Sequence, residues 1–101
     1  SPVTTGLVSE NTLPKEFALE QNFPNPFNPS TTLHFALPSA SEVRLSVFNT
    51  LGQTVVTLVN KPMNAGNHVV QFNASNLSSG MYFYRIQAGD FTAVRKMTLI
   101  K

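Results

Sequence analysis

Few side chains in this sequence are suited to acid–base or metal chemistry, and they are spread along the chain. The acids are Glu10, Glu16, Glu20, Glu42 and Asp90, and the histidines are His34 and His68. No two acids have the spacing of a general acid–base pair or of a calcium loop, and two separate histidines do not make a metal site. The sequence has no cysteine, no Gly-x-Ser-x-Gly turn and no glycine-rich phosphate loop. We therefore expect no enzyme, no metal and no cofactor.

The composition describes one small domain with few charges. The chain has 101 residues, of which 12% are charged, and a net charge of +2. Its basic residues are scattered, so nucleic acid is not expected as a partner, and no apolar run is long enough to span a membrane. Residues 1–15 lack the pattern of a signal peptide. We interpret 1–15 as a linker from a longer parent protein and 16–101 as the folded domain.

Short apolar runs with a period of two alternate with clusters of Gly, Pro, Asn and Ser, which indicates strands and not helices. Strands are expected near 17–20, 32–37, 43–48, 54–59, 68–72, 80–86 and 91–100, with a loop over 60–66. This number and spacing predict an all-β fold, a seven-stranded immunoglobulin-like antiparallel β-sandwich. Tyr82 is expected to form a tyrosine corner, and His68 a hydrogen bond of structural importance.

Residues 21–31 have an unusual composition, with three prolines, three asparagines and two phenylalanines. Each proline fixes its own φ and restricts the preceding residue, so the segment is stiff. Its central part, called the motif loop below, consists of Asn25, Pro26, Phe27, Asn28 and Pro29. We expect Asn25 and Asn28 to bond neighbouring backbone as Asx turns, and Phe27 to fill one end of the sandwich. The segment is either a rigid crossover between two strands or a recognition surface.

Three apolar residues fall on the side of their strands opposite the predicted core, where a solvated sheet is normally polar. They are Phe48, Met81 and Phe83. They either form a docking patch or are covered by a loop or a shifted strand register.

An ordered set of motifs resembles the C-terminal sorting domain of type IX secretion cargo. The motifs are FPNPFNPSTT at 23–32, LGQ at 51–53, AGNH at 65–68, LSSGMY at 77–82 and KMTLIK at 96–101. Together they cover about residues 16–101. The sequence departs from the family pattern at Phe72, where the family often has Trp, and at Asn67, where an aromatic residue is frequent.

The resemblance implies a non-catalytic domain that directs a larger cargo protein out of a Gram-negative bacterium. The cargo passes through the periplasm and is either secreted or kept at the cell surface. It implies recognition by an outer-membrane translocon, and removal by a surface sortase that cuts in the linker. In the family the last strand matters most for export, which places the recognition residues at Lys96, Met97, Leu99 and Lys101. We expect the two lysines at the rim and Met97 and Leu99 in the core. An ordinary edge strand would also carry lysines, because they prevent edge-to-edge aggregation.

Two other functions remain open at this stage. One is a carbohydrate-binding or adhesive module of an extracellular enzyme, although Trp is absent and the tyrosines are predicted to face inward. The other is a structural assembly domain, like the related immunoglobulin-like domains of flagellar hook caps.

Overall fold

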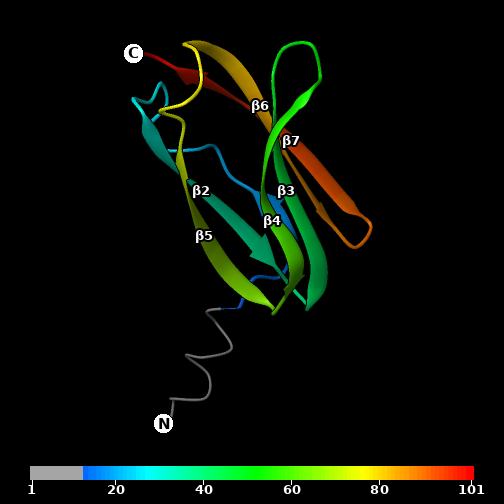
Figure 1. The fold of residues 1–101 in the computed structure, drawn as a ribbon. Coiled ribbons are helices and arrows are strands. Elements are labelled where there is room, and N and C mark those ends of the chain that lie inside the picture. The colour runs from blue at the N-terminus through cyan, green and yellow to red at the C-terminus, as the bar shows by residue number, and fades with distance from the viewer. Residues whose placement is uncertain (1–12) are drawn as a thin grey trace, which may run out of the picture.

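Seven strands form two antiparallel sheets in the computed structural model, which describes residues 13–101 (Figure 1). The strands are β1 (Ala18–Leu19), β2 (Ser30–Leu37), β3 (Ser41–Phe48), β4 (Thr54–Met63), β5 (Gly66–Asn73), β6 (Gly80–Ala88) and β7 (Phe91–Leu99). One sheet has the order β1-β2-β5 and the other β4-β3-β6-β7. The expected immunoglobulin-like sandwich is therefore confirmed, with every expected strand in place.

The core lies between the two sheets and is filled by alternate residues of the long strands. Buried side chains are Leu33, Phe35 and Leu37 of β2, Val43, Leu45 and Val47 of β3, and Tyr82, Tyr84 and Ile86 of β6. The period of two places these residues on one face of each strand. The hydrophobic effect of burying both inner faces is what holds the sheets together.

The prediction of a loop over 60–66 was wrong, because β4 continues through Pro62 to Met63 and only residues 64–65 connect it to β5. Pro62 pairs with Glu42 of β3. Proline lacks an N–H group, but β4 lies at the edge of its sheet, where one side of the strand needs no donor. The edge position therefore explains why the strand does not stop at the proline.

Two turns form as their residue types predict. In the turn after β3, the Asn49 side chain accepts hydrogen bonds from the backbone N–H of Leu51 and of Gln53, at 2.9 and 3.0 Å. Gly52 has φ of +84°, which a residue with a side chain rarely adopts. Between β6 and β7, Gly89 and Asp90 make the expected two-residue turn.

Side chains predicted to be structural make the expected bonds. The Tyr82 hydroxyl donates to the backbone oxygen of Ser78 at 2.7 Å, which confirms the tyrosine corner. The ring nitrogen Nε2 of His68 lies 2.8 Å from the backbone oxygen of Asn64, and the ring stacks on Phe35. His68 is therefore held by the fold, as expected for a structural histidine.

Tyr84 of β6 bonds to the segment that directly follows β1 of the other sheet. Its hydroxyl donates to the backbone oxygen of Glu20 at 2.6 Å. Burial raises the pKa of Tyr84 to about 12, although the backbone N–H of Asn22 and the charge of Arg95 oppose the shift. The folded chain therefore favours the protonated phenol more strongly than the unfolded chain does.

This shift predicts a loss of stability at high pH. The contribution of Tyr84 is complete below pH 10.0, the ordinary value, and disappears as the pH rises toward about 12. We expect the free energy of unfolding to fall by roughly 1–2 kcal/mol more for the wild type than for Tyr84→Phe between about pH 9 and about pH 11.5. Urea denaturation at the two pH values measures the difference. Equal losses in both proteins would contradict the assignment.

Candidate recognition surface

The motif loop runs beside the free edge of β7, the last strand of the four-stranded sheet. The backbone N–H of Phe27 donates to the oxygen of Thr98 at 2.9 Å, and the N–H of Ile100 donates to the oxygen of Phe27 at the same distance. These bonds form a parallel bridge between Phe27 and Leu99. The loop thus adds a very short fifth strand to the sheet. Figure 1 shows the loop, in cyan, close to the C-terminus at one end of the sandwich.

Two side chains of the same segment extend this pairing. Asn25 Oδ1 accepts a hydrogen bond from the backbone N–H of Thr98 at 3.0 Å, and Gln21 Nε2 donates to the oxygen of Lys96 at 2.7 Å. The prediction that Asn25 closes a local Asx turn was therefore wrong. Thr98 presents an N–H on the side of β7 away from β6, and the amide of Asn25 satisfies this otherwise unpaired edge group.

Asn22 closes the segment locally. Its Nδ2 group donates to the backbone oxygen of Pro24 at 3.1 Å and to the Thr31 hydroxyl at 3.0 Å, and that hydroxyl donates to the same Pro24 oxygen at 2.9 Å. Asn22 and Thr31 are both buried. A buried polar group is costly unless it is bonded, so this small network fixes the conformation of the segment.

Phe27 is the apolar anchor of the motif loop. Its side chain is only 1% exposed, and its ring packs against Phe72 with the centroids 6.1 Å apart. The prediction that Phe27 fills one end of the sandwich is confirmed. Phe72, which stands where the family often has Trp, is itself buried in the core. This position therefore serves packing, and it presents no aromatic surface.

The four recognition residues expected from the last strand occupy two environments. Met97 and Leu99 are buried in the core. Lys96 and Lys101 are exposed, and Lys101 Nζ donates to the backbone oxygen of Ser75 at 2.8 Å. The structure thus brings the motif loop and the end of β7 into one surface, here called the terminal surface, on which the two lysines are displayed. Asn28 is exposed on the same loop.

Three contributors to this surface were not identified from the sequence. Gln21 and Asn22 precede the residues that carry the family motif, and their partners depend on the fold. Arg95 of β7 donates from Nε to the backbone oxygen of Leu19 at 2.9 Å, and so ties β1 to the last strand. For Gln21 and Asn22, the sequence did offer one signal, because both are polar residues close to three prolines. Prolines restrict the backbone and leave carbonyl groups with which polar side chains can bond.

The part of the chain that the structure describes contains no cluster of three or more His, Asp or Glu side chains that could hold a metal ion. Over the same residues, no helix is long and apolar enough to cross a membrane. The terminal surface has hydrogen-bonding and charged groups but no convergent acid, base and nucleophile.

Comparison with known proteins agrees with this description. The family described as the secretion system C-terminal sorting domain matches residues 21–101, which include the motif loop and all of β7. The chain belongs to this family. Its role is C-terminal sorting in type IX secretion, as the motifs suggested. No curated protein matches the sequence.

The sorting domain also has a structural neighbour. It is similar to PorZ, an essential bacterial surface component of the type IX secretion system of Porphyromonas gingivalis, with a TM-score of 0.59 and 15% sequence identity. The similar region covers 83% of this chain and 12% of PorZ. At this identity the likeness concerns the fold alone, and it agrees with a small β-sandwich that also occurs as part of a larger protein.

The Asn25 bond predicts a difference between two asparagines of the motif loop. We expect Asn25→Ala to lower the free energy of unfolding by about 1 kcal/mol, because the edge N–H of Thr98 loses its acceptor. Asn28→Ala removes the same group without removing a hydrogen bond to β7, and is expected to change stability by less than about 0.5 kcal/mol. Urea denaturation of the two variants provides the comparison. Equal losses would show that the bond to Thr98 contributes nothing specific.

Proposed function

We propose that this domain is a folded sorting signal that the outer-membrane translocon recognises through the terminal surface. The observation that supports this most directly is the pairing of the motif loop with the end of β7. Phe27 and Leu99, which form the bridge, are separated by about 70 residues of chain. The terminal surface therefore exists only when the whole domain has folded, and a receptor that binds it selects folded cargo.

In this proposal, the buried and the exposed side chains at the end of the chain have different roles. Met97 and Leu99 anchor the strand in the core, and their burial fixes the backbone to which Lys96 and Lys101 belong. Held in this way, the ammonium groups lose less conformational freedom on binding than they would on a flexible tail. A partner with carboxylates at matching positions would gain affinity and a faster encounter from them.

The proposal includes the fate of the signal after transport. The parent cargo would lie upstream, and a surface sortase would cut in the linker, interpreted as residues 1–15, and so release the domain from the cargo. Of this linker, residues 1–12 lie outside the described residues. The cargo would then be secreted or remain at the cell surface of a Gram-negative bacterium.

The role of the lysines is testable with a fluorescent passenger that has its own inner-membrane export signal and carries this chain at its C-terminus. In a cell with type IX secretion, Lys96→Glu/Lys101→Glu is expected to reduce surface delivery about tenfold, because two favourable charge contacts become repulsive. Arg44→Glu/Lys61→Glu makes the same change in charge at two exposed positions on β3 and β4. This control is expected to be delivered normally.

Thermal unfolding of both purified double variants separates recognition from stability. Removal of residues 96–101 would be a weaker test, because it deletes the buried Met97 and Leu99 together with the lysines. Normal surface delivery of a folded Lys96→Glu/Lys101→Glu passenger would leave the lysines with only the protective role of charged residues on an edge strand.

A further inference from the structure

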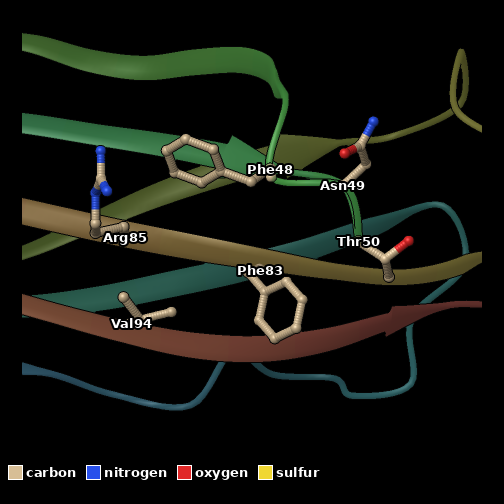
Figure 2. A pocket seen from close by; sticks show the side chains of 7 residues that line it. Phe48, Asn49, Thr50, Phe83, Arg85 and Val94 are labelled. Carbon is tan, nitrogen blue, oxygen red and sulfur yellow. The ribbon is translucent and has the colours of Figure 1, made fainter.

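A groove of about 260 Å³ crosses the outer face of the four-stranded sheet, away from the core. Phe48 of β3, Phe83 and Arg85 of β6 and Val94 of β7 line it, and the turn after β3 closes one end. Figure 2 shows these side chains on one side of three neighbouring strands, with Asn49 and Thr50 beyond the two rings. Two of the three outward apolar residues noted in the sequence, Phe48 and Phe83, therefore belong to a shaped site.

The register of the strands places the residues that line the groove next to one another. Phe48 pairs directly with Phe83, and Arg85 pairs with Val94. Directly opposed residues of antiparallel strands place their side chains on the same face and in contact range. Val94 is 55% exposed, and the rings of Phe48 and Phe83 are partly exposed. Within residues 13–101, no strand covers this face of the sheet, so its apolar side chains stay partly exposed.

The groove is also positively charged. The guanidinium carbon of Arg85 lies 4.7 Å from the centroid of the Phe48 ring, a cation–π contact. Within residues 13–101, no acidic side chain forms an ion pair with Arg85. The nearest charged positions on the same face, to judge from the strand register, are also basic, since Lys96 pairs with Phe83 and Arg44 pairs with Gln87 beside Arg85. The site therefore combines an apolar floor with an unpaired positive charge.

The outer edge of β7 lies next to this groove. On the side of β7 away from β6, the segment 21–27 bonds the backbone of Lys96, Thr98 and Ile100. Backbone groups alternate between the two sides of an antiparallel strand, so those of Thr92 and Val94 face the same way. Among the described residues, only β6 pairs with β7 as a strand. However, β1 packs beside the first half of β7, where Phe17 stacks on Phe91 and Arg95 Nε donates to the backbone oxygen of Leu19. The groove on the outer face is therefore the accessible surface next to this edge.

We propose that the groove binds an acidic and apolar segment of a partner protein. An aromatic or aliphatic side chain of the segment would fill the space between Phe83 and Val94. A neighbouring carboxylate would pair with Arg85. The positive charge of the groove and its partly exposed apolar floor both favour this occupant.

Two other occupants fit the observations less well. A second copy of this chain would bring the same basic face against Arg85 and Lys96, so like charges would oppose each other. A polysaccharide would need an open aromatic face for stacking, but Arg85 covers the ring of Phe48, and both tyrosines are buried. Binding to the groove is measured with the purified chain in solution. Its outcome is independent of whether the translocon recognises the terminal surface.

The test is an NMR titration of the full ¹⁵N-labelled chain with a synthetic peptide in which Asp alternates with Phe and Val. We expect saturable shifts of the amides of 48–52, 83–85 and 92–94. Arg85→Glu is expected to weaken binding by at least about tenfold. Arg44→Glu makes the same change in charge on the same face outside the groove, and should keep binding within about twofold. The spectrum of each variant reports its fold in the same experiment.

Several results would overturn the proposal. One is the absence of saturable shifts up to about 1 mM peptide, because a specific site of this kind is expected to have a Kd below about 1 mM. Another is equal weakening by Arg85→Glu and Arg44→Glu, which would indicate general electrostatic attraction. Equal binding of a peptide with Lys in place of Asp would exclude the carboxylate contact. Saturable binding of a cello-oligosaccharide at the same amides, without peptide binding, would assign the groove to carbohydrate.

Discussion

The bonds between the segment 21–27 and the last strand are the constraint on which the rest of this structure depends. β7 forms the edge of its sheet, and an edge strand presents unpaired N–H and C=O groups that invite association with other chains. The backbone of Phe27 and the side chains of Gln21 and Asn25 satisfy these groups from Lys96 to Ile100. The C-terminal segment is therefore an integral part of the sandwich, and its lysines project from a defined backbone.

This closure joins the two ends of the domain and both of its sheets. Tyr84 and Arg95 add bonds to the backbone of Glu20 and Leu19. The contacts that shape the terminal surface therefore join residues more than 70 positions apart in the sequence. They can form only after synthesis of the last residues. Under the proposed function, a sorting signal built in this way would report complete folding of the domain.

The sequence predicted the strands well because their signal is local. Alternation of apolar and polar residues identifies a strand and its inner face without knowledge of its partner. The fate of Asn25 depended on a residue 73 positions away, so local turn chemistry gave the wrong partner. Residues 60–66, which include Pro62, were predicted to be a loop because the edge position of β4 was unknown. Phe48 and Phe83 were recognised as outward, whereas Arg85 and Val94 joined them only through the register of three strands.

Native-state hydrogen exchange along the outer edge of β7 tests the central claim most directly. The amides of Thr98 and Ile100 are bonded to the segment 21–27, whereas those of Thr92 and Val94 face the same side and have no backbone acceptor there among residues 13–101. The account predicts that Thr98 and Ile100 exchange at least about a hundredfold more slowly than Thr92 and Val94, because their release requires the closure to open. Equally fast exchange of all four amides would show that the last strand is not closed by the motif loop and its neighbours.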